Sequence, residues 1–241
     1  LLIDLLKKVE YNVQGIEDLE IDQWYLVMAN HQSWVDIIVL QKIFHNRIPF
    51  VKYFLKRELI WVPILGLAWW AMDYPFMKRY SAEFIKKNPH LKGKDLEMTR
   101  RYCEKFKDKP TSIINFVEGT RFTSKKKEIQ KSPYRYLLKP KSGGISFVLS
   151  AMGEYINKII DVTIVYPDGA ESLWRFLCSS RTRIHVHINV FPIDPGLIGD
   201  YFNDETFRDN FQNWMNSLWS KKDMRIEEIL LQSEHGNGSY A

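Results

Sequence analysis

Apolar residues along the chain fall into short strand-like runs that alternate with longer helical stripes. Runs rich in β-branched and aromatic residues predict strands at 24–29, 48–53, 111–117, 159–166 and 182–191. Apolar residues at helical spacing predict helices at 33–45, 94–108, 143–152 and 204–231. This alternation is typical of an α/β fold, so we expect a mixed, largely parallel sheet flanked by helices. Functional side chains in such sheets gather in loops after strand carboxyl ends.

The length of the chain suits one domain with its own core. It has 241 residues, and 45% of them are hydrophobic. We assign 21–232 to this domain, 1–20 to an amphipathic lead-in from a membrane anchor, and 233–241 to a disordered tail.

Tryptophan is abundant for a chain of this size, which suggests contact with lipid. The sequence has eight Trp, and three of them (Trp61, Trp69 and Trp70) lie in the uncharged run 59–72. This run is too short to span a bilayer. It is therefore either buried core or a segment that lies in the membrane interface.

Positive charge is concentrated between Arg121 and Lys141. Eight Lys or Arg and one Glu give this basic segment a net charge of +7, whereas the whole chain carries +5. Such a segment favours an anionic partner, which could be phospholipid head groups, a phosphorylated cofactor or nucleic acid. The alternative is a solvated, mobile loop, above all around Lys125, Lys126 and Lys127.

Cysteine usage argues against disulfides and metal binding. The chain has two cysteines, no C-x-x-C, and no spacing of ligands that suits a metal. Cys103 falls on an apolar helical stripe, which favours a core position over a reactive thiol.

The stretch "NHQSWVD", from Asn30 to Asp36, follows a predicted strand directly. Ser33 and Asp36 have the spacing of a capping box, in which Asp36 would be structural. Alternatively, His31 is a general base and Asp36 orients its ring. Roughly 0.35 His-x4-Asp pairs are expected by chance, and the pair His90 and Asp95 is a second copy. Only the first copy lies between a strand end and a helix start.

A second candidate motif is "FVEGTRF", which follows the predicted strand 111–117. Gly119 permits a tight turn and a close approach of the backbone to a ligand. Arg121 offers a planar fork that suits a phosphate monoester, and Glu118 could orient that fork or bind a hydroxyl. The alternative is a turn with an incidental surface ion pair.

Four ordered blocks together resemble the glycerolipid acyltransferases, and within them most closely the lysophosphatidic acid acyltransferases of a bacterial inner-membrane subgroup. The blocks are the N-H-x4-D at a strand end, "PFMKR", "FVEGTR" and "VTIVYP". The resemblance implies an acyltransferase at the cytoplasmic face of the bacterial inner membrane, where it makes phosphatidic acid.

The resemblance also implies residue roles. His31 deprotonates the acceptor hydroxyl, which attacks the acyl thioester directly, and Asp36 orients His31. The acceptor phosphate would lie against a wall of Lys56, Arg79, Glu118, Gly119, Thr120 and Arg121. An acyl or donor pocket would be shaped by Val165, Tyr166 and Pro167, where Tyr166 departs from the family pattern.

The expected partners are a lysophospholipid acceptor, an acyl thioester donor and the membrane surface. Acyl-CoA or acyl carrier protein would serve as the donor, with no other cofactor and no metal. We expect Trp61, Trp69, Trp70 and the lysines 125–127 to contact the membrane or the donor.

Three other hypotheses stay open. The first is an acyltransferase for another lysophospholipid, and the second is a hydrolase with Ser33 or a cysteine as nucleophile, although the chain has no G-x-S-x-G. The third is a non-enzymatic basic protein that binds anionic lipid or RNA. Because no RNA-binding signature is present, we expect no nucleic-acid partner.

Overall fold

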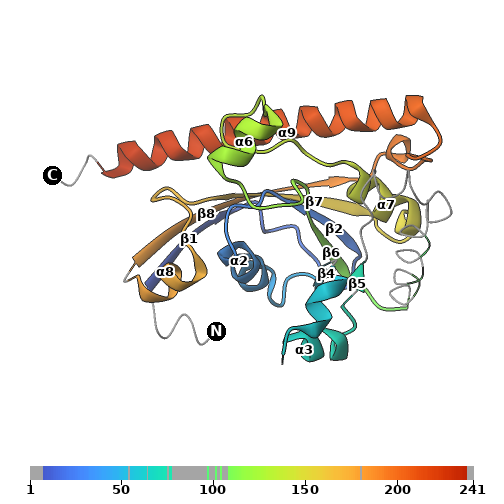
Figure 1. The fold of residues 1–241 in the computed structure, drawn as a ribbon, viewed down its shortest axis with the longest axis horizontal. Coiled ribbons are helices and arrows are strands. Elements are labelled where there is room, and N and C mark those ends of the chain that lie inside the picture. Colours follow the sequence, from blue (N-terminus) through green and yellow to red (C-terminus); the bar gives the residue numbers. More distant parts are fainter. Residues whose placement is uncertain are drawn as a thin grey trace.

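The computed structural model describes residues 8–53, 55–63, 65–74, 76–77, 97, 101, 104, 108–179 and 181–237. Its centre is a six-stranded sheet in the order β1-β8-β7-β2-β6-β3 (Figure 1). Neighbouring strands are parallel except β7 and β8, which are antiparallel. The predicted fold class is confirmed. The strands are β1 (Lys8–Gln14), β2 (Tyr25–Ala29), β3 (Val51–Tyr53), β6 (Ser112–Phe116), β7 (Lys158–Val165) and β8 (Arg181–Pro192).

Strand β2 is central and fully buried, because helices cover both faces of the sheet. Tyr25, Val27 and Ala29 pack into one hydrophobic cluster, whereas Leu26 and Met28 pack into the other. All five are 0% exposed. The strand is therefore apolar at every position, as is typical of a parallel strand between two helical layers.

The two helical layers are separated by the sheet (Figure 1). One layer contains α2 (Val35–Phe44), α3 (Leu65–Ala71) and α8 (Leu173–Cys178). The other contains α6 (Ser124–Gln130), α7 (Gly143–Met152) and the long α9 (Glu205–Asn237). Short elements complete the fold: β4 (Leu55–Lys56) pairs with β5 (Phe76–Met77), and two 3-10 turns are η1 (Arg57–Trp61) and η3 (Pro195–Leu197).

A buried lysine fastens α9 to the sheet. The Lys222 ammonium donates to the Val162 carbonyl over 2.6 Å and to Thr163 Oγ1 over 3.2 Å, and lies 2.7 Å from the Asp161 carboxylate. Burial lowers the pKa of Lys222, while Asp161 acts in the opposite direction. A buried charge is tolerated only with such partners, so α9 is held in one position along β7.

Most of the predicted elements are present, with ends that differ by a few residues. The predicted helix 94–108, Cys103 and the second His-x4-Asp pair lie outside the described residues, apart from isolated positions of that helix. Two predicted boundaries differ from the structure. Residues 8–14 form β1 rather than a lead-in, because Val9, Tyr11 and Val13 alternate and pack against the core. Residues 233–237 continue α9 rather than starting a disordered tail.

Within the described part of the chain, no helix has both the length and the apolar character needed to cross a bilayer.

Candidate active site

The candidate site forms where three parallel strands end at the same edge of the sheet. Ala29 at the end of β2 pairs with Phe116 of β6 on one side and with Val162 of β7 on the other. The loops after these strands therefore lie next to one another. This arrangement brings together His31, the loop that carries Arg121, and Tyr166.

His31 and Asp36 are in direct contact. His31 Nδ1 lies 2.8 Å from Asp36 Oδ2, and the Asp36 side chain is 0% exposed. The same oxygen accepts hydrogen bonds from the main-chain amides of Gln32 at 2.6 Å and Ser33 at 2.9 Å. The same Asp36 oxygen thus accepts from the start of the helix and contacts the imidazole, so the two interpretations of this motif do not exclude each other.

The imidazole ring of His31 is held by a stacking contact as well as by Asp36. It stacks on Phe116, with ring centroids 4.0 Å apart and an interplanar angle of 17°. If Nδ1–H donates to the Asp36 carboxylate, Nε2 is unprotonated and can accept a proton. The side chain of His31 is 13% exposed, so a ligand can reach the imidazole.

The backbone around His31 is fixed from both neighbouring strands. The buried side-chain amide of Asn30 donates to the Ile164 carbonyl over 2.9 Å and accepts from the Ile164 amide over 2.8 Å. On the other side, the Phe122 amide donates to the His31 carbonyl over 2.7 Å. The first contact joins the histidine turn to β7, and the second joins it to the loop that follows β6.

A pocket of about 380 Å³ opens beside His31. The predicted residues Gly119, Thr120 and Arg121 line it together with His31. The Arg121 guanidinium lies 5.0 Å above the ring of Trp34, which orients the cation at the pocket. The rest of the wall is mostly apolar and aromatic: Trp34, Ile37, Tyr53, Leu55, Trp69, Tyr74, Ile114 and Phe116, with the amides of Gln41 and Asn115.

Glu118 is buried behind this wall and does not line the pocket. It is 0% exposed, and among the described residues neither carboxyl oxygen has a hydrogen-bonding partner. Burial raises the pKa of Glu118 to about 8; the main chain at Leu138 and His31 and the charge of Lys222 oppose this rise. The prediction placed Glu118 against the acceptor, whereas the structure places it beneath the loop.

Two lysines of the basic segment lie against the 119–121 loop. Lys126 Nζ donates to Thr120 Oγ1 over 2.7 Å and to the Arg121 carbonyl over 2.9 Å. Gly119 has a φ of +69°, and a β-carbon there would lie 3.4 Å from Lys141 Nζ. Arg121, Lys126 and Lys141 therefore surround one turn with three cations. The positive φ at position 119 is a conformation that glycine adopts without strain.

The three lysines predicted to contact the membrane or the donor (Lys125, Lys126 and Lys127) have different surroundings. Lys126 does not line the pocket but bonds to Thr120 and Arg121, which do. Lys127 Nζ donates to the Arg135 carbonyl over 3.0 Å. Lys125 is exposed. Arg135 forms an ion pair with Glu227 of α9, so part of the positive charge is already matched within the protein.

The residues predicted to form the acyl pocket lie elsewhere. Val165 is buried in the hydrophobic cluster beneath α7 and α9, and Tyr166 donates a hydrogen bond of 2.6 Å to Asp36 Oδ1. Neither these two nor Pro167 lines the pocket beside His31. The apolar wall comes instead from Trp34, Tyr74 and residues of α2, β3, β4, α3 and β6.

The remaining predicted residues divide into three groups. Lys56 forms part of β4, but its side chain and all of Arg79 lie outside the described residues. Trp69 lines the pocket, whereas Trp61 and Trp70 are 85% and 63% exposed. Of the alternative nucleophiles, Ser33 and Cys178 do not line the pocket, and Cys103 lies outside the described residues. Ser33 Oγ donates to the Glu171 carbonyl, and Cys178 is exposed on α8 away from the pocket.

Three contacts of the site were missed by sequence reasoning. Trp34 under Arg121, Phe116 under His31 and Tyr166 on Asp36 each join segments that are far apart in the sequence. Two of these residues lie close to the motifs in the sequence: Trp34 is inside N-H-x4-D, and Phe116 directly precedes "VEGTR". Only the sheet order reveals which side chains meet.

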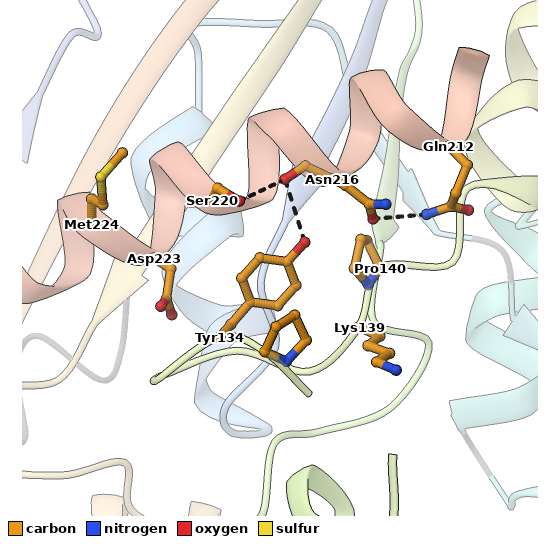
Figure 2. Close-up of a pocket in the computed structure, with 9 residues that line it drawn as sticks. Tyr134, Lys139, Pro140, Gln212, Asn216, Ser220, Asp223 and Met224 are labelled. Carbon is orange, nitrogen blue, oxygen red and sulfur yellow. Dashed lines mark hydrogen bonds between the residues drawn. The ribbon is translucent and has the colours of Figure 1, made fainter. Parts of the chain in front are cut away.

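A larger concavity, of about 770 Å³, lies on the opposite side of the sheet, between α9 and the loop 133–140. Figure 2 shows Tyr134 reaching from this loop to the Asn216 carbonyl of α9, a hydrogen bond of 3.3 Å. Asp223 accepts from the amides of Arg135 and Tyr136, which fastens the loop to the helix. Because no histidine is among the residues that line it, we assign the chemistry to the smaller pocket, which His31 lines.

Comparisons with known proteins identify a family and several relatives. The model of a family described as Acyltransferase matches residues 10–167. The chain is 21% identical over 228 residues to 1-acyl-sn-glycerol-3-phosphate acyltransferase epsilon of Mus musculus, covering 85% of this chain and 57% of that protein. It is 22% identical over 218 residues to lysocardiolipin acyltransferase 1 of Gallus gallus, covering 85% and 53%. The chain thus spans a little over half the length of these curated relatives.

A solved structure supports the fold. The crystal structure of the 1-acyl-sn-glycerophosphate acyltransferase PlsC from Thermotoga maritima matches with a TM-score of 0.54 and 19% sequence identity. The match covers 94% of this chain and 74% of that one.

Proposed function

The chain belongs to the acyltransferase family, and we propose that it transfers an acyl group from a thioester donor to a hydroxyl of 1-acylglycerol-3-phosphate, making phosphatidic acid. The observation that carries this proposal is the contact between His31 and buried Asp36 at the wall of a pocket that Arg121 also lines. A positioned base contributes roughly 10²–10⁴-fold to such a reaction.

In the proposed step, the acceptor hydroxyl attacks the thioester carbonyl carbon while its proton passes to His31 Nε2. The tetrahedral intermediate collapses, the carbon–sulfur bond breaks, and the leaving thiolate takes the proton from His31. Asp36 stabilises the imidazolium between these two transfers. The step therefore needs no covalent acyl-enzyme.

The phosphate of the acceptor would lie at the 119–121 turn. Arg121 provides a planar fork, and the ammonium groups of Lys126 and Lys141 add positive charge next to the same turn. Glu118 is the acidic residue nearest to this turn in the sequence, but its side chain is buried and so does not face the ligand. The glycerolipid name of the mouse relative supports a phosphate-bearing acceptor.

The apolar wall of the pocket would hold an acyl chain. Leu55, Trp69 and Phe116 are among its side chains, and none carries a charge. The donor would be acyl-CoA or acyl carrier protein. Because the chicken relative is named a lysocardiolipin acyltransferase, another lysophospholipid is the second candidate acceptor.

We further propose that the protein works at a membrane surface, because both the acceptor and the product are lipids. Exposed Trp61, Leu67 and Trp70 lie on η1 and α3, close to Trp69 in the pocket wall. Exposed aromatic residues of this kind are suited to the bilayer interface. The bacterial inner membrane stays a prediction.

The test is release of thiol from acyl-CoA, or from acyl carrier protein, with a panel of lysophospholipids. We expect release that depends on lysophosphatidate and yields phosphatidic acid by mass spectrometry. Release without any acceptor would support a hydrolase instead. Faster turnover with lysocardiolipin would favour the second acceptor.

A further inference from the structure

Tyr166 completes the surroundings of Asp36 from the third strand of the site. Asp36 Oδ2 accepts from His31 and from two main-chain amides, whereas Tyr166 donates to Oδ1 over 2.6 Å. Among the described residues, Tyr166 is the one side chain seen to bond to that oxygen. Tyr166 is 5% exposed and Asp36 is 0% exposed, so water does not replace this contact.

The position of Tyr166 is set by the sheet. It follows the last residue of β7, and β7 is joined to β2 through the pair of hydrogen bonds between Asn30 and Ile164. The contact is therefore independent of the loop that carries Arg121, which holds His31 from the β6 side. Burial, followed by the charge of Asp36, raises the pKa of the Tyr166 phenol well above its ordinary value. The hydroxyl is thus always a donor in the working range of pH.

We propose that Tyr166 is a positioning residue for acyl transfer, and that its hydroxyl fixes the Asp36 carboxylate and limits how strongly that carboxylate attracts the proton on His31. This inference rests on the proposed function. A strong donor on Oδ1 takes up part of the carboxylate charge. It also prevents rotation of the carboxylate, which would move Oδ2 away from Nδ1.

The sign of the expected effect follows from this charge sharing. Without the Tyr166 hydroxyl, more of the negative charge of Asp36 acts on the imidazole, and His31 keeps its proton up to a higher pH. The other titratable groups around the pair are Tyr53 on β3, Glu118 after β6, and Tyr11 on β1 next to Tyr166. All three stay in place when only the Tyr166 oxygen is removed.

The experiment compares Tyr166→Phe with Tyr25→Phe in the full chain. Tyr25 is the matched control, because it is buried in the same hydrophobic cluster and its hydroxyl accepts a bond from the Glu20 amide, at the other end of β2. Two readouts are measured against pH: kcat/KM for thiol release with lysophosphatidate, and the protonation of the His31 imidazole by NMR, assigned with His31→Ala.

We expect Tyr166→Phe to lower kcat by about ten- to a hundredfold, the range of a lost hydrogen bond to a charged group. The acceptor KM should stay within about twofold, and both pH readouts should move upward. Tyr25→Phe should leave both readouts unchanged. Equal losses in the two variants with unchanged pH profiles would overturn the inference and leave Tyr166 as core packing.

A second variant covers the case in which Tyr166→Phe does not fold. Incorporation of 3-fluorotyrosine at position 166 keeps the ring and makes the phenol a stronger donor, so both pH readouts should move downward; unchanged readouts would overturn the inference. If the wild-type protein releases no thiol with any acceptor, the proposed function fails. In that case the NMR readout alone decides whether Tyr166 acts on the His31–Asp36 pair.

Discussion

The main-chain amide of Phe122 donates a hydrogen bond to the main-chain carbonyl of His31 across 2.7 Å. The residue that follows Arg121 is thereby joined to the residue proposed as the base. The loop that would bind the acceptor phosphate and the turn that would deprotonate the acceptor hydroxyl are thus parts of one rigid unit. Such a unit favours a fixed distance between phosphate and hydroxyl in the acceptor.

His31→Ala should abolish acyl transfer in a protein that stays folded, since His31 is partly exposed and its removal leaves the core intact. We expect a loss of about 10²–10⁴-fold in kcat, the contribution of a positioned base. His45→Ala is the control, because His45 is exposed at the other end of α2. Wild-type turnover by His31→Ala would refute the mechanism. Circular dichroism checks the fold.

Arg121→Lys should raise the acceptor KM by about tenfold and the donor KM much less. Lysine keeps the charge but loses the planar fork and the stacking on Trp34. Arg135→Lys is the matched control, because Arg135 pairs with Glu227 of α9 instead. An effect confined to the donor KM would assign Arg121 to the donor side.

Lys126→Met should lower kcat/KM for the acceptor by about tenfold, whereas Lys125→Met should have little effect. Only Lys126 is bonded to Thr120 and to the Arg121 carbonyl, and a hydrogen bond from a charged group is worth roughly 1.5–3 kcal/mol. Steady-state kinetics on detergent-dispersed substrate separates this effect from membrane binding. Equal losses in the two variants would mean that α6 contributes only diffuse charge.

Glu118→Gln should remove a pH dependence of stability. The folded-state pKa of about 8 lies above the ordinary 4.5, so protonated Glu118 stabilises the fold fully below about pH 4.5. That contribution is lost as the pH rises to about 8. In urea unfolding at pH 8.5, the free energy of unfolding of Glu118→Gln should therefore exceed that of the wild type by an amount on the order of a few kcal/mol.

At pH 5 the two proteins should unfold alike, since glutamine resembles the protonated acid in shape and charge. Glu128→Gln provides the control on exposed α6. A constant difference between wild type and Glu118→Gln at both pH values would contradict a raised pKa.

Replacing Trp61 and Trp70 by Ala should weaken binding to liposomes by at least about tenfold, because burying one large apolar side chain contributes roughly 1.5–3 kcal/mol. High salt should have little effect on this apolar contribution to binding, whereas it should weaken the contribution of the charged residues. Ile129→Ala, at an exposed apolar position on α6 in the other helical layer, is the control. Unchanged co-sedimentation of the double variant would exclude η1 and α3 as the membrane contact.

Hydrophobic periodicity predicted the fold well because each buried strand and amphipathic helix carries its own local signal. β1 was missed although Val9, Tyr11 and Val13 alternate, because residues 1–20 were assigned as a whole to an amphipathic lead-in. At the site, His31, Asp36 and the Arg121 loop came from local motifs. The contact of Tyr166 with Asp36 depends on which strands are neighbours, and a single sequence does not state that order.

The hydrogen bonds between Asn30 and Ile164 span 134 residues of sequence, and this separation has a consequence for how the protein is made. While the ribosome is still translating the region before β7, the emerging chain already contains His31, Asp36 and Arg121. At that stage β2 has no strand paired along the edge that β7 later occupies, and Asp36 lacks its hydrogen bond from Tyr166. Closing so long a loop is slow relative to forming local helices. Acyl-transfer competence should therefore appear late in synthesis, after β7 has entered the sheet, and any product that stops short of it should be inactive.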